Sequence, residues 1–138
     1  MARNTDLSPG STEVELLGRT YEISFTLDAV DEICDAFKCK VRDISKMIQD
    51  NENPDFRKNM VKMLAILINS SIKLHNEDYP QDTWQEITET QIRRRLTHLA
   101  YARAFEALVN AYVRGFISDG NKQDDDDIGA DPNQMRAT

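Results

Sequence analysis

The spacing of hydrophobic residues along the chain changes near residue 26. Between Glu13 and Phe25 polar and apolar residues alternate, which is the pattern of a β-strand with one buried face. The alternation is centred on Leu17-Gly18-Arg19, where Gly18 can take the positive φ that a tight turn requires. This segment therefore predicts a β-hairpin whose strands meet around Leu16–Thr20.

After residue 26 the apolar residues recur at helical spacing. A first helix is expected to end near Lys38, and either Thr26 or Asp28 can cap its beginning. A short second helix is expected over residues 41–50. The predicted core face of the first helix comprises Leu27, Val30, Cys34 and Phe37, and the second is marked by Val41, Ile44, Met47 and Ile48.

A third and longer helix is predicted from Pro54 to about Asn76, because Asn53 is a good N-cap and proline suits the first helical position. Its apolar arc is about 200° wide, more than a surface helix needs. We therefore expect a central helix that is covered on two sides. The main apolar face comprises Phe56, Met60, Met63, Leu64, Leu67, Ser71 and Leu74, and Val61, Ala65, Ile68 and Ile72 extend it sideways.

The segment Thr88-Glu89-Thr90-Gln91 fits a capping box and predicts a fourth helix from Glu89 to about Ile117. Unbroken, such a helix would be about 43 Å long, whereas a globule of this size is about 35 Å across. Its apolar stripe also changes side after Ala100. The helix is therefore expected either to break near Ala100 or to project from the domain.

The second apolar stripe of that helix can be core, a self-association surface or a landing site for another protein. We predict that it is a partner-binding surface, because a change of side requires a second set of neighbours. The predicted partner-binding residues are Tyr101, Phe105, Leu108, Tyr112 and Phe116.

These elements together predict a mainly α fold (α+β), with an N-terminal β-hairpin followed by four helices in a single domain over residues 13–117. Residues 1–12 are predicted to be a flexible leader, and residues 118–138 a disordered acidic tail. The chain has 138 residues and a net charge of −7. Such an acidic chain repels phosphate backbones, so nucleic acid is not an expected partner.

The sequence contains no constellation of residues that indicates catalysis. Nucleotide-binding loops and nucleophile elbows are absent. His75 and His98 lack ligand-like neighbours, and the spacing of Cys34 and Cys39 favours reduced core thiols over a zinc or redox site. The run Asp124–Asp127 is too flexible for a defined metal cage. We therefore expect a non-enzyme with no cofactor and no metal.

No apolar run is long enough to span a bilayer, and residues 1–12 do not look like a signal peptide. A cytoplasmic protein is therefore expected. The one basic cluster, Arg93–Arg95, wraps around its helix, and we expect it to pair with Glu86, Glu89 or the acidic tail.

The segment Val14–Phe37, with its Gly-Arg turn and its helix start Thr-Leu-Asp-Ala-Val-Asp-Glu-Ile, resembles the small tail assembly chaperones of long-tailed bacteriophages. Relatives in gene transfer agents and defective prophages share this pattern. The resemblance covers residues 13–76 and follows the order hairpin, helix, short helix, long helix. The matching segments are Leu16–Thr20, Leu27–Ile33, Val41–Ile48 and Pro54–Asn76.

The resemblance implies a non-enzymatic protein of the host bacterial cytoplasm that coats the tape-measure protein, keeps it soluble and recruits tail-tube subunits. It also implies departure before the virion is complete. Two alternatives stay open. One is a structural head–tail connector or tail-completion subunit. The other is a small nucleic-acid-binding regulator that uses Arg93–Arg95 with Lys58, Lys62 and Lys73. Formation of a homo-oligomer is compatible with each of them.

Overall fold

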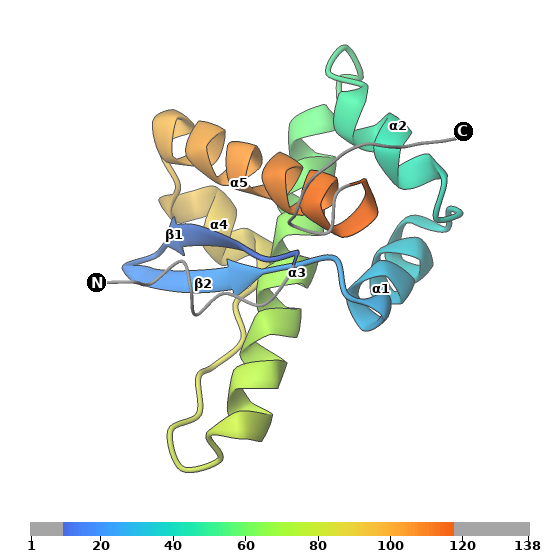
Figure 1. The fold of residues 1–138 in the computed structure, drawn as a ribbon. Coiled ribbons are helices and arrows are strands. Elements are labelled where there is room, and N and C mark those ends of the chain that lie inside the picture. The colour runs from blue at the N-terminus through green and yellow to red at the C-terminus, as the bar shows by residue number, and fades with distance from the viewer. Residues whose placement is uncertain (1–9, 118–138) are drawn as a thin grey trace.

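A computed structural model describes residues 10–117 and confirms a mainly α fold with an N-terminal β-hairpin. The long helix α3 crosses the molecule, and the hairpin and the other helices are arranged around it (Figure 1). Most of the predicted leader and all of the predicted acidic tail lie outside the described residues. The elements are β1 (Thr12–Leu16), β2 (Arg19–Ile23), α1 (Leu27–Phe37), α2 (Asp43–Gln49), α3 (Phe56–Asp78), α4 (Glu89–Arg95) and α5 (His98–Phe116).

The hairpin pairs β1 and β2 as antiparallel strands, with Leu16 opposite Arg19. The sequence predicts a positive φ for Gly18 alone, but Leu17 (φ 53°) and Gly18 (φ 81°) both have one. Two such residues in a two-residue loop form the type I′ turn, whose twist matches that of the strands. β1 lies against α5 and β2 against α3, so the inward side chains of the hairpin are part of the core.

The first helix begins at the predicted cap, because the Thr26 hydroxyl accepts a hydrogen bond from the Ala29 N–H at 3.1 Å. Its buried face differs from the prediction. Ala29, Val30 and Ile33 are buried, whereas Leu27 is 86 % exposed. Leu27 is the first helical residue, and the helix meets the core only from Ala29 onwards. The assignment of Leu27 to the core is therefore wrong.

The end of α1 carries local backbone strain that a substitution can release. Lys38 follows the helix in the left-handed region (φ 53°, ψ 51°), which costs a non-glycine residue about 1–2 kcal/mol. Its side chain is exposed. Lys38→Gly is expected to raise the free energy of unfolding by about 0.5–1 kcal/mol, net of the entropy that glycine adds to the unfolded chain. Urea denaturation measures this change. Lys46→Gly, inside α2, is the control and should lower stability by about 1 kcal/mol. Equal effects of the two substitutions would contradict the strain argument.

The central position of α3 agrees with the prediction. This helix contacts the other four helices and β2, and Leu67, Ile68 and Ile72 are fully buried. The helix begins at Phe56, two residues after the predicted start. Asn53 does not cap it, because its side chain accepts a hydrogen bond from the Asp55 N–H at 2.9 Å and forms a turn before the helix.

The predicted fourth helix is two helices. The capping box at Thr88 and Gln91 is present, but α4 ends at Arg95, and Leu96 is extended (φ −83°, ψ 129°). Thr97 then caps α5 by accepting a hydrogen bond from the Ala100 N–H at 3.2 Å. The break comes slightly before Ala100. The change of side in the apolar pattern therefore arises because α4 and α5 are separate helices with separate orientations.

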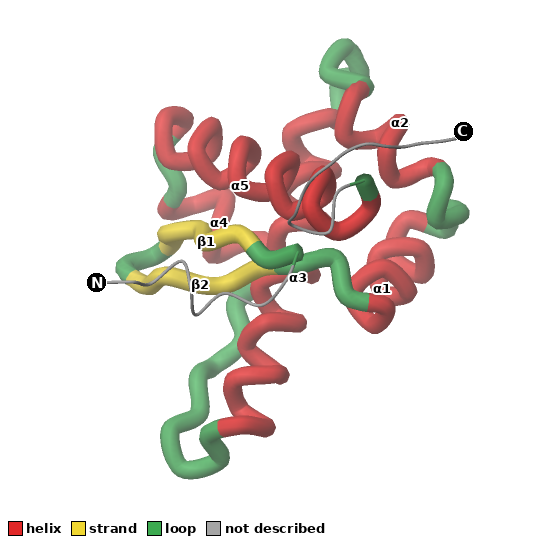
Figure 2. The backbone as a smooth tube through the Cα atoms, viewed as in Figure 1, coloured by secondary structure: helices red, strands yellow, loops and turns green. Residues whose placement is uncertain are grey.

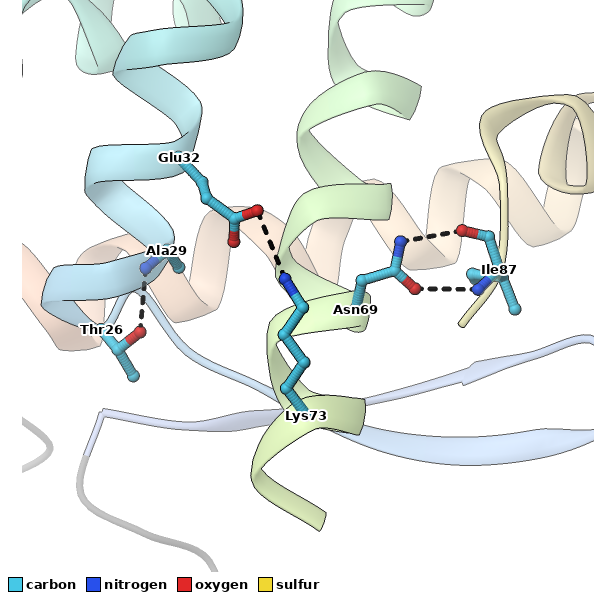
Figure 3. Close-up of polar contacts among 6 residues, drawn as sticks. All are labelled: Thr26, Ala29, Glu32, Asn69, Lys73 and Ile87. Atoms are coloured by element: carbon cyan, nitrogen blue, oxygen red, sulfur yellow. Dashed lines mark hydrogen bonds and ion pairs between the residues drawn. The ribbon is translucent and has the colours of Figure 1, made fainter. Parts of the chain in front are cut away.

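The segment after α3 runs back along this helix (Figure 2). Two asparagine side chains hold it there, and Figure 3 shows one of them, Asn69. Asn69 donates to the Ile87 carbonyl at 2.8 Å and accepts from the Ile87 N–H at 2.9 Å. Asn76 makes the same pair of bonds to Trp84, at 3.0 and 2.8 Å. Since Asn69 and Asn76 are two helical turns apart, they lie on one face of α3 and fix an extended strip against it.

Candidate functional site

The aromatic stripe predicted to bind partners lies largely inside the molecule. Near the start of α5, Phe105 packs edge-on against Phe56 of α3 with 5.5 Å between ring centroids. Tyr101 stacks on Phe105 at 6.3 Å. Leu108 is 1 % exposed, so it is a core residue and is not available to a partner in this fold.

The other end of the stripe packs against Phe25, the residue that leads from the hairpin towards α1. Tyr112 and Phe116 each place their ring centroid 5.6 Å from that of Phe25. Only Phe116, with its neighbours Val113 and Ile117, leaves substantial apolar area exposed. Partner binding by α5 stays a prediction, and its accessible part is the C-terminal end of the helix.

A different apolar surface lies between α1 and α3. Leu27 and Leu74, both predicted to be core, are 86 % and 48 % exposed and line the same groove of about 720 Å³. Leu27 comes from the first turn of α1 and Leu74 from the last third of α3. Leu74 follows Ile72, the last buried residue of α3. Two exposed leucine side chains in one groove form an apolar surface that another protein can bind.

The rim of this groove is acidic. Lys73 is its one cationic lining residue, and its Nζ lies 3.6 Å from a carboxylate oxygen of Glu32 across the groove (Figure 3). Both side chains are about half exposed, so this ion pair contributes little to stability. The acidic lining residues are Asp28, Asp31, Glu32, Asp35 and Glu77. The groove therefore favours apolar side chains flanked by lysine or arginine.

The apolar surface continues past Leu74 along the C-terminal half of α3. Leu74 also lines a second hollow, between α3 and β2, together with Tyr79 and Trp84. The Trp84 ring stacks on His75 with 3.6 Å between centroids, and the Arg19 guanidinium lies over it at 4.3 Å. His75 is thus packed in a structural role, as expected for a histidine without metal-ligating neighbours. We call the groove between α1 and α3, which Leu27 and Leu74 line, the α1–α3 groove.

The structure does not gather the basic residues named for nucleic-acid binding on one face. Arg93 and Lys58 line one pocket, whereas Arg95 lines another, beside the hairpin. Lys73 lies in the acidic groove, and Lys62 donates to the Ala36 carbonyl at 3.3 Å. The ion pairs expected from Arg93–Arg95 to Glu86 or Glu89 are absent among residues 10–117.

Side chains that could support chemistry are sparse in the described part of the chain. No group of three or more His, Cys, Asp or Glu residues there could hold a metal ion; Asp124–Asp127 lies outside it. Cys34 and Cys39 are free thiols. Burial, followed by the influence of Cys34, raises the pKa of the Cys39 thiol above its ordinary value. The thiol is therefore protonated at neutral pH, which disfavours nucleophilic catalysis.

The raised pKa of Cys39 predicts slow alkylation. Only the thiolate reacts, and a higher pKa leaves less thiolate at neutral pH. Iodoacetamide should therefore modify Cys39 several-fold more slowly in the folded chain than in the same chain in urea. The folded rate should rise steeply as the pH passes above the ordinary thiol range. Peptide mass mapping over time measures both rates, and equal rates in the two states would contradict the assignment.

Comparison with protein-family models, curated proteins and solved structures finds no match to this chain. Among the helices at residues 10–117, none is both long and apolar enough to cross a bilayer.

Proposed function

We propose that this protein is a phage tail assembly chaperone that binds a helical segment of the tape-measure protein in the α1–α3 groove, without catalysis. The observation that carries the proposal is the pair Leu27 and Leu74, exposed together in a groove with an acidic rim. The fold order of hairpin, helix, short helix and long helix supports the proposal, since it is the order that the resemblance implies.

The groove fits the apolar face of an amphipathic helix. Such a helix presents apolar residues at spacings of three and four, and Leu27 and Leu74 offer anchors on opposite walls. Burying a fully exposed leucine side chain contributes about 1.5–3 kcal/mol, and completing the burial of Leu74, which is 48 % exposed, contributes about half of that. Acidic side chains along the rim favour a helix that carries lysine or arginine beside its apolar residues. A tape-measure protein, being long and helical, offers many such segments.

Recruitment of tail-tube subunits requires a second surface. The exposed end of α5, formed by Val113, Phe116 and Ile117, is the accessible remainder of the predicted partner-binding stripe. In this proposal it contacts tail-tube subunits while the α1–α3 groove holds the tape-measure protein. The work is done in the host bacterial cytoplasm, before the particle is complete.

Coexpression tests the proposal. The tape-measure protein of the phage or prophage that encodes this chain is produced alone and together with the chain. We expect it to be insoluble alone and to copurify with this chain as a soluble complex. Mass spectrometry of purified virions should then find no copy of this chain. The proposal would be contradicted if the tape-measure protein were insoluble in both cases. It would also be contradicted if purified virions retained this chain, as they would retain a connector.

A further inference from the structure

A pocket where α3, α4 and α5 meet has the opposite charge to the α1–α3 groove. It has a volume of about 300 Å³ and contains no acidic residue in its lining. Arg57 and Lys58 come from the first turn of α3, and Arg93 comes from α4. This concentration of positive charge stands out in a chain whose net charge is −7.

Among residues 10–117, the cationic side chains around this pocket have no acidic partners. Within residues 10–117 the ion pairs are those of Lys73 with Glu32 and of His75 with Asp82, and neither involves the pocket. Like charges held close together repel one another, and the repulsion is relieved when an anion binds between them. The positive end of the α5 dipole adds to this potential, since Thr97 and His98 also line the pocket.

Tyr101 lies in the wall of the pocket. Its hydroxyl oxygen is buried and has no hydrogen-bond partner among the described residues, which is uncommon because buried polar groups are nearly always paired. Burial raises the pKa of this hydroxyl, and the nearby Arg57 charge partly opposes the shift. The group is therefore a protonated donor at neutral pH.

We propose that this pocket is a binding site for an anionic oxygen group, a phosphate or a carboxylate, held by Arg57, Lys58 and Arg93. Arginine suits this role because its planar guanidinium binds such groups through two parallel hydrogen bonds. Val61, Ile92 and Leu96 line the same pocket and provide contact for the carbon atoms attached to that group. The site is separate from the α1–α3 groove and does not depend on the proposed function.

Titration of the full chain tests the site. Backbone amide signals of Thr97 and His98 are followed by NMR at constant ionic strength, with inorganic phosphate in one series and a blocked tetra-aspartate peptide in the other. Saturable shifts in either series support the proposal and identify the source of the anionic group. Absence of saturation in both series, or shifts that sodium chloride reproduces, overturns it.

Variants separate a built site from general attraction to positive charge. Arg57→Gln combined with Arg93→Gln should weaken binding at least tenfold. Arg42→Gln combined with Arg103→Gln removes the same charge from exposed positions outside the pocket and should change affinity less than twofold. Tyr101→Phe should raise Tm, because an unpaired buried hydroxyl is removed, and should change affinity less than twofold, because that hydroxyl is not accessible to a bound anion. Equal losses in the two arginine pairs would overturn the proposal.

Discussion

Replacing Leu27 and Leu74 by glutamate is expected to abolish capture of the tape-measure protein while leaving the fold intact. Both side chains are substantially exposed in the free protein, so their replacement removes little native burial. In the complex Leu27→Glu would lose about 1.5–3 kcal/mol of apolar contact, and Leu74→Glu about half of that, because Leu74 is only 48 % exposed. Each added carboxylate would also repel the existing acidic rim. We expect affinity to fall at least about a hundredfold, as measured by calorimetry with a tape-measure fragment.

Matched controls exist on other faces of the molecule. Leu99 is 62 % exposed on α5 and Val41 is 48 % exposed before α2, and neither lines the α1–α3 groove. Leu99→Glu with Val41→Glu adds the same charge and removes similar exposed apolar area, so it should preserve binding. Circular dichroism of both double variants should match that of the parent. Equal loss of binding in the two pairs would show that the groove is not the capture site.

The hairpin and helices could be predicted because each has a strong local signal. Alternation around Gly18, the threonine cap at Thr26 and the capping box at Thr88 all specify local structure within a few residues. The break between α4 and α5 has a local signal too, since Thr97 is a good N-cap. The apolar pattern alone leaves two alternatives, a break near Ala100 and a projecting helix. It does not show that the residues before and after Thr97 belong to two helices.

The α1–α3 groove could not be predicted from periodicity. An apolar residue at helical spacing identifies the face of a helix, but it does not say how far the neighbouring element extends along that face. Leu27 precedes the point where α1 meets the core, and Leu74 follows Ile72, the last buried residue of α3. Conversely, the burial of Leu108 could not be predicted from local sequence. It depends on tertiary packing of α5, which includes contact with β1, an element far away in the sequence.

Asn69→Ala is expected to lower the free energy of unfolding by about 2–4 kcal/mol, because it leaves both the N–H and the carbonyl of the buried Ile87 without partners. Urea denaturation measures the loss. Asn69→Asp keeps the acceptor but sets a carboxylate oxygen against the Ile87 carbonyl oxygen, so it should also lower stability. Asn59→Ala is the matched control, since Asn59 lies on the same helix, is also partly buried and makes no side-chain hydrogen bond among the described residues. Its cost should stay below about 1 kcal/mol. If Asn69→Ala cost no more than Asn59→Ala, the returning segment would be held by the apolar contacts of Trp84 and Ile87 and not by the asparagine side chains.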